Sequence, residues 1–137
     1  MAEFIFKNLV AQRGLQNEFL IQSSATSSEE IWGEVGNPVY PPARECLKKH
    51  GIDCGNKTAV QLKKSDYDKY DLFLLMDDRN VRNVGKIFGS DPQKKVHKLL
   101  EFANSNADVA DPWYTRDFDV AYDDILKGCK ALLDVLI

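Results

Sequence analysis

An aspartate followed by a proline and two aromatic residues is the part of this 137-residue chain best suited to chemistry. The four residues are Asp111, Pro112, Trp113 and Tyr114, and they stand shortly before the C-terminal stretch of regular apolar spacing. A carboxyl group that aromatic rings shield from water can keep its proton near neutral pH, so an acid in such a place can protonate a leaving group. Without further context, an Asp-Pro pair more often begins a turn.

No nucleophile that would complement this acid is evident in the sequence. The cysteines are Cys46, Cys54 and Cys129, and the sixth residue after each is isoleucine or valine, so the pattern C-x5-R does not occur. An odd number of cysteines without a C-x2-C pair argues against a disulfide framework and against a zinc site. We therefore expect reduced thiols, with Cys46 and Cys129 packed in the core. His50 and His97 have no partners at metal-ligand spacing, so we expect no metal and no cofactor.

Composition indicates one soluble domain in the cytoplasm. A chain of 137 residues with 44% hydrophobic and 28% charged residues is long enough to bury a core without metal or disulfide support. The net charge of −3 offers no basic excess, so we expect no nucleic-acid partner. No stretch approaches the ~18 apolar residues of a membrane span, and the first residues do not resemble a signal peptide.

Apolar spacing along the chain predicts alternating helices and strands. The run from Tyr70 to Met76 is continuously apolar apart from Asp71, which is typical of a strand covered on both faces. Asp77 then falls at the carboxyl end of that strand. The other expected elements are helices over 1–12, 41–50, 80–88 and 118–137, a strand over Phe19–Ser23, a capped turn over 65–69, and a short strand or extended segment over Val96–Phe102.

This order predicts an α/β fold of three layers, a parallel sheet with flanking helices. Such folds usually open with a buried strand that feeds the first helix, whereas this chain opens with a helix. We therefore expect the first strand to be missing. Ligands in these sheets bind beyond the carboxyl ends of the strands, the side on which Asp77 and the Asp111 loop are expected.

Taken together and in order, several short pieces resemble the low-molecular-weight protein tyrosine phosphatase family over the whole chain. The ordered set is more specific than any single piece, and it ends with Asp-Pro and two aromatics ahead of the last helix. The matching pieces are Met1 to Lys7, Ser23 to Ser27, Gly36-Asn37-Pro38, Ala43-Arg44, His50-Gly51-Ile52, Met76-Asp77 with Asn80, and Asp111 to Tyr114.

The resemblance implies a cysteine thiolate that attacks the phosphorus of phosphotyrosine or another aryl phosphate, and an aspartic acid that protonates the departing phenolate. Asp111 matches that acid. Trp113 and Tyr114 match the aromatic wall around the substrate ring, and Trp32 is expected to add a further wall. The family's phosphate-binding loop, C-x5-R-S-P, lies between the first strand and the first helix, and this chain begins at the methionine that would follow its proline.

The sequence therefore predicts a family member that is truncated at its N-terminus and inactive as given. Losing a strand leaves sheet edges with unpaired backbone groups, so we also expect a swapped or sheet-extended homo-oligomer. Two alternatives remain. The chain could be a non-catalytic binding module, a pseudophosphatase that holds a partner in the aromatic cleft, or, with less support from its cysteines, an arsenate-reductase-like protein.

Overall fold

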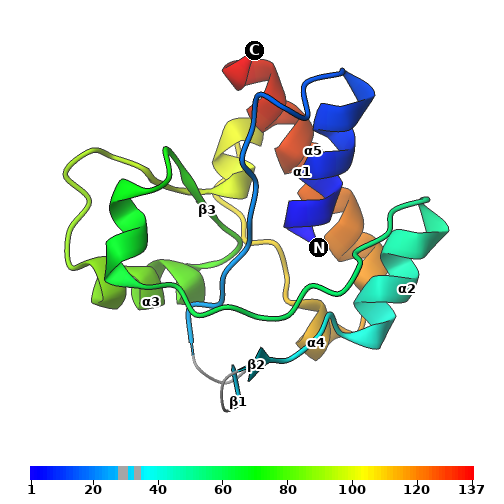
Figure 1. Ribbon diagram of the computed structural model, residues 1–137, viewed down its shortest axis with the longest axis horizontal. Coiled ribbons are helices and arrows are strands. Elements are labelled where there is room, and N and C mark those ends of the chain that lie inside the picture. The colour runs from blue at the N-terminus through cyan, green and yellow to red at the C-terminus, as the bar shows by residue number, and fades with distance from the viewer. Residues whose placement is uncertain (28–30, 33–34) are drawn as a thin grey trace.

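Helices and short strands alternate along the chain in the computed structural model (Figure 1). The structure describes residues 1–27, 31–32 and 35–137, and of Ile31, Trp32, Val35, Trp113 and Tyr114 it describes only the backbone. The elements are α1 (Ala2–Gln12), β1 (Ile31–Trp32), β2 (Val35–Gly36), α2 (Pro41–Lys49), the 3-10 helix η2 (Lys64–Asp68), β3 (Phe73–Leu75), α3 (Asp78–Phe88), β4 (Val96–Lys98), the 3-10 helix η3 (Leu99–Ala103), α4 (Pro112–Thr115) and α5 (Phe118–Leu136).

Strand β3 pairs in parallel with β4, with Phe73 opposite Val96 and Leu75 opposite Lys98. Successive side chains of a strand point to opposite faces. Phe73 and Leu75 enter a smaller core cluster with Val84 and Phe88 of α3, whereas Leu74 packs against the larger cluster. The larger cluster is built mainly from α1, α2, η3 and α5, which lie on the opposite side of β3 from α3 (Figure 1). The predicted α/β class, a parallel sheet with flanking helices, is confirmed.

The helices begin and end where local chemistry favours it. Two prolines open α2 and two lysines occupy its last turn, which suits the missing proline N–H and the helix dipole. The Asp117 carboxylate accepts a hydrogen bond from the Val120 backbone N–H and caps α5. All four predicted helices are present, and the predicted turn over 65–69 is the 3-10 helix η2. Among the described residues, no helix combines the length and apolar character that a membrane span requires.

The predicted strand over Phe19–Ser23 is wrong, because the segment pairs with no strand in the described part of the chain. Other contacts hold it. The Phe19 ring packs edge-on against Phe6 at 5.9 Å, and the Ser23 N–H donates to Glu3 rather than to a strand. Just beyond the segment, Ala25 forms an isolated parallel bridge with Gln61.

The strand predicted over Val96–Phe102 is correct only as far as Lys98. From Leu99 the chain turns into η3, in which Leu99 and Leu100 are both buried. The turn packs closely on α5 at Gly128, where an added Cβ would lie 2.6 Å from the Leu99 Cγ atom.

Candidate active site

Two interactions position the loop that carries Asp111. The backbone N–H of Val109 donates to the Met76 carbonyl at 2.8 Å, and the Val109 side chain is buried in the larger core cluster. One residue earlier, the Asp108 carboxylate lies 2.6 Å from the Lys98 ammonium at the end of β4. The hydrogen bond of Lys98 lowers the pKa of Asp108. The loop is therefore attached at the carboxyl ends of both parallel strands, where α/β sheets bind ligands.

Asp111 itself is exposed and stands immediately before α4. Its carbonyl accepts a hydrogen bond from the Thr115 N–H at 3.2 Å, so the residue forms the entry to a single helical turn. Beyond the turn, Arg116 adopts a positive φ of 62° and donates from Nη1 to the Tyr40 hydroxyl at 3.1 Å. That contact joins the end of the Asp111 segment to the start of α2, which lies next to α4 in Figure 1.

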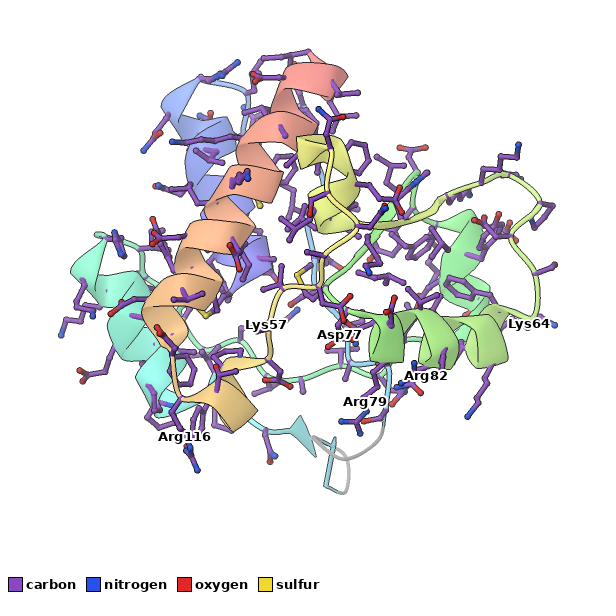
Figure 2. All side chains as sticks on the ribbon, turned by 180° about the vertical axis from the view of Figure 1, so that it is seen from behind. Lys57, Lys64, Asp77, Arg79, Arg82 and Arg116 are labelled. Carbon is purple, nitrogen blue, oxygen red and sulfur yellow. The ribbon has the colours of Figure 1, made fainter. Side chains whose placement is uncertain are left out.

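Asp77 acts as a helix cap at the carboxyl end of β3. Its carboxylate accepts a hydrogen bond from the Asn80 N–H at 2.8 Å, and the Asn80 side-chain oxygen accepts one from the Met76 N–H at 3.1 Å. The side-chain amides of Asn80 and Asn83 also reach the Thr26 hydroxyl, at 3.4 and 3.2 Å. Figure 2 shows Asp77 at the start of α3, with Arg79 and Arg82 on the same helix. The hydroxyl-rich turn is thus fixed against the strand end.

Glu3, in the first turn of α1, is a buried anchor that sequence reasoning did not single out. One carboxylate oxygen accepts from both the N–H and the hydroxyl of Ser23, at 2.9 and 2.7 Å, and the carboxylate also pairs with Lys7 and Lys57. Burial alone raises the pKa of Glu3, but the donors of Lys7, Ser23 and Lys57 together outweigh it and lower the pKa to about 2. This carboxylate ties the start of α1 to the Ser23 turn.

The side chains of the three predicted substrate-wall residues lie outside the described part of the structure. The backbone places Trp32 in β1, and Trp113 and Tyr114 in α4. Figure 1 shows the β1–β2 hairpin and α4 at the same end of the molecule. The role of these aromatic rings stays a prediction.

Comparisons with known proteins agree with this architecture. The sequence model for low molecular weight phosphotyrosine protein phosphatases matches residues 1–137. The chain belongs to this family. It is 31% identical to the low molecular weight protein-tyrosine-phosphatase YfkJ of Bacillus subtilis, over 97% of this chain and 84% of that protein. It is 33% identical to the low molecular weight phosphotyrosine protein phosphatase of Gallus gallus, over 98% of this chain and 85% of the relative.

Solved structures of this phosphatase family share the fold. The crystal structure of YfkJ from Bacillus subtilis superposes with a TM-score of 0.89 at 29% identity and covers 98% of this chain and 84% of that one. SP-PTP, the low molecular weight protein tyrosine phosphatase of Streptococcus pyogenes, superposes with a TM-score of 0.84 at 30% identity, over 99% of this chain and 83% of that one.

Two of the three thiols in this chain have a raised pKa. Cys46, Cys54 and Cys129 are all free and buried, as predicted for the two on helices. Burial raises the pKa of Cys129 to about 12. Burial, followed by the neighbouring Asp119 carboxylate, also raises the pKa of Cys46. A thiol attacks phosphorus as the thiolate, so neither of these two groups is prepared for that reaction near neutral pH.

Proposed function

We propose that this chain carries the proton-donating part of an enzyme that hydrolyses phosphotyrosine or related aryl phosphate monoesters, with Asp111 as the general acid. The observation that supports this role most is the attachment of the Asp111 loop to the carboxyl end of β3 through Val109 and Met76. Family membership supplies the reaction class. An exposed carboxyl beside a strand end can approach the bridging oxygen of a substrate bound there.

In the complete reaction, a cysteine thiolate attacks phosphorus while the bond from phosphorus to the phenolic oxygen breaks. Asp111 gives its proton to that oxygen and leaves as carboxylate. Water then attacks the cysteinyl phosphate, and the Asp111 carboxylate takes a proton from it, which restores the acid. Trp113, Tyr114 and Trp32 would enclose the aromatic ring of the substrate.

The polypeptide of residues 1–137 by itself contains no C-x5-R pattern. Without the thiolate and the cationic loop, the acid has no phosphoryl transfer to assist. We therefore propose that these 137 residues alone are catalytically silent, and that a strand and a C-x5-R-S-P loop supplied ahead of Met1 complete the site.

The test is a fusion that adds such a segment to Met1. The fusion should hydrolyse aryl phosphates, and Asp111→Asn in the fusion should lower kcat/KM, which reports the step that releases the phenolate, by about 10²–10⁴-fold for phenyl phosphate. The loss of kcat/KM should be much smaller for p-nitrophenyl phosphate, because that phenolate leaves readily without a proton. Asp123→Asn, an exposed carboxylate on α5, is the matched control and should leave kcat/KM unchanged. An equal loss of kcat/KM for both substrates would contradict the acid role of Asp111.

The same fusion also tests the alternative function. If it folds and binds phosphate without turnover, the chain is better described as a binding module.

We also propose that the protein works in a reducing compartment such as the cytoplasm, where its three cysteines stay free.

A further proposal is that the 137-residue chain associates with other copies of itself through its sheet. Among the described strands, β3 has a partner only in β4, so its second edge carries donors and acceptors available for pairing. Light scattering at several protein concentrations should show a dimer or larger species that dissociates on dilution. A monodisperse monomer at all concentrations would contradict this proposal.

A further inference from the structure

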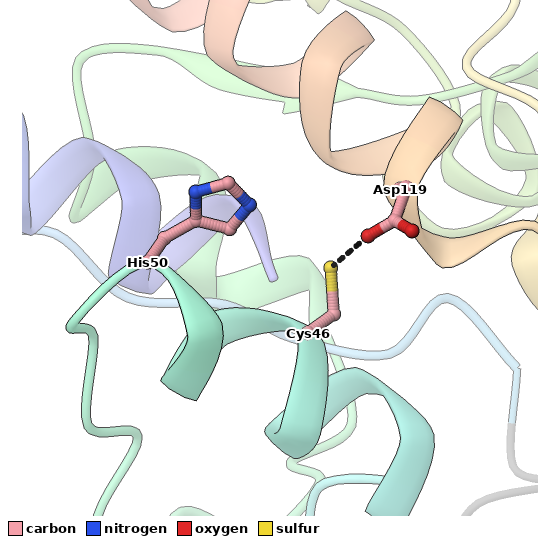
Figure 3. Close-up of side chains that lie close together, drawn as sticks. All are labelled: Cys46, His50 and Asp119. Carbon is pink, nitrogen blue, oxygen red and sulfur yellow. Dashed lines mark hydrogen bonds between the residues drawn. The ribbon is translucent and has the colours of Figure 1, made fainter.

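Three side chains that can ligate a metal converge between α2 and the start of α5. Cys46 and His50 lie four residues apart, at the end of α2, and therefore share one face of the helix. Asp119 stands in the first turn of α5, 73 positions after Cys46. The Cys46 sulfur, a His50 ring nitrogen and an Asp119 oxygen all lie within 4.8 Å of one another. Figure 3 shows the three side chains directed into the same space.

We propose that Cys46, His50 and Asp119 bind a divalent cation of borderline softness, Zn²⁺ or a similar ion. One thiolate, one imidazole and one carboxylate form a ligand set that suits zinc and is unsuited to Mg²⁺ or Ca²⁺, which take oxygen ligands. The sequence indicated no metal-binding partner for His50, because Asp119 and Cys46 come within reach of it only in the folded chain.

The distances require only a small contraction around the ion. Tetrahedral zinc with ordinary bond lengths places its sulfur, nitrogen and oxygen ligands about 3.4–3.6 Å from one another. The Cys46 Sγ atom is already 3.6 Å from Asp119 Oδ1. The remaining separations need to shorten by at most about 1.4 Å, which rotation of the exposed Asp119 side chain and a slide of the His50 ring parallel to Tyr122 can supply.

The surroundings orient the ligands. The His50 ring stacks on Tyr122, with centroids 3.7 Å apart and planes 5° from parallel. Tyr122 is buried and lies one turn after Asp119 on α5, so the same helix face presents the carboxylate and fixes the imidazole. The sulfur forms the buried base of the site, and His50 and Asp119 are exposed at its opening. A supporting residue that holds a histidine ligand in place is typical of metal sites.

Space for a fourth ligand adjoins the three side chains. An open hollow of about 580 Å³ is lined by Cys46 and Asp119 together with Pro42, Glu45 and Phe118. A water molecule can complete the coordination from this side. On binding, the Cys46 thiol transfers its proton to the solvent, and the bound ion links α2 to α5.

The Lys49 ammonium group competes with a bound cation for the Asp119 carboxylate, and replacing this exposed lysine tests the proposal without disturbing the core. Its ammonium group lies 3.0 Å from Asp119 Oδ1, the oxygen that also faces Cys46. The lysine side chain is 62% exposed and can move aside. A cation must displace it, so Lys49→Gln should tighten metal binding by about 1.5–5-fold, as expected for removing one competing exposed charge pair.

The experiment is a titration of the reduced, metal-free protein with Co²⁺, which takes the place of zinc and is visible in solution. One equivalent should produce a thiolate-to-cobalt charge-transfer band that Zn²⁺ abolishes. Cys46→Ser should remove the band, and His50→Gln should weaken Co²⁺ binding at least about tenfold, as is usual for loss of a ligating group. The matched controls are His97→Gln, which alters the other of the two histidines, and Asp134→Asn on the exposed face of α5, and both should bind as the parent does.

Thermal unfolding of each metal-free variant shows whether it is folded. In the parent protein Zn²⁺ should raise the Tm, and in Cys46→Ser it should not. The proposal is overturned if neither the parent nor Lys49→Gln develops the band, or if a folded Cys46→Ser variant retains it.

Discussion

At the level of single residues, the neighbouring groups determine the role of each aspartate. Asp111 is exposed at a helix entry, Asp77 caps α3, and Asp108 pairs with Lys98. The sequence identified Asp111 through the proline and aromatics that follow it. It could not identify Glu3 or Asp119, because their partners Ser23 and Cys46 are distant in sequence and only folding brings them together.

Glu3 gives the chain a pH dependence of stability. Its pKa in the folded protein is about 2, below the ordinary value of 4.5. A depressed pKa stabilises the fold above pH 4.5, and that contribution is lost as the pH falls from about 4.5 to about 2. Glu3→Gln should therefore lower the free energy of unfolding at pH 7 by about 1–2 kcal/mol, allowing for solvent screening of the half-exposed Lys7.

Urea unfolding across this pH range measures the effect. The difference between parent and Glu3→Gln should shrink as the pH approaches 2. Glu18→Gln, at an exposed position, should follow the parent throughout. A difference that stays constant with pH would mean that Glu3 contributes by packing and hydrogen bonding and not through its charge.

At the scale of elements, helices were predicted better than strands. An amphipathic helix satisfies its own backbone, so the pattern of Phe118 to Leu136 is sufficient to define α5. A strand needs a neighbour. Phe19–Ser23 has the composition of a strand but no described partner, and the apolar run over 70–76 is a strand only where β4 pairs with it, at Phe73–Leu75.

The contact between η3 and α5 depends on Gly128. An alanine there would place its Cβ 2.6 Å from Leu99 Cγ and 3.3 Å from Leu100 Cδ2, and both leucines are buried. Gly128→Ala should reduce the free energy of unfolding by about 1–3 kcal/mol, despite the better helix propensity of alanine.

A matched glycine on another helix separates crowding from propensity. Gly85 in α3 is exposed, and an added Cβ would meet nothing within 4 Å. Gly85→Ala should stabilise the protein by about 0.5–1 kcal/mol in the same denaturant titration. If Gly128→Ala stabilised the protein to a similar extent, the close packing of η3 on α5 would be refuted.

At the scale of the whole molecule, the fold brings the Asp111 loop, the Asp77 cap and the Ser23–Ser27 turn to one end of the sheet. The family and the α/β class followed from the ordered motifs and the apolar patterns, and both are confirmed. The substrate wall stays a prediction, because it depends on the side chains of Trp32, Trp113 and Tyr114. At the junction of α2 and α5, the same fold also brings together three side chains that can ligate a metal, outside the predicted site.

The most direct test of the account is the hydrolysis of p-nitrophenyl phosphate by the purified 137-residue polypeptide, measured beside its Asp111→Asn variant. We expect both to release nitrophenol at the rate of buffer alone, because we propose that the 137 residues hold the acid but no nucleophilic thiolate. Turnover by the parent polypeptide above the buffer rate, reduced but not abolished in Asp111→Asn, would contradict this expectation, since the chain would then contain a working nucleophile among its own three cysteines.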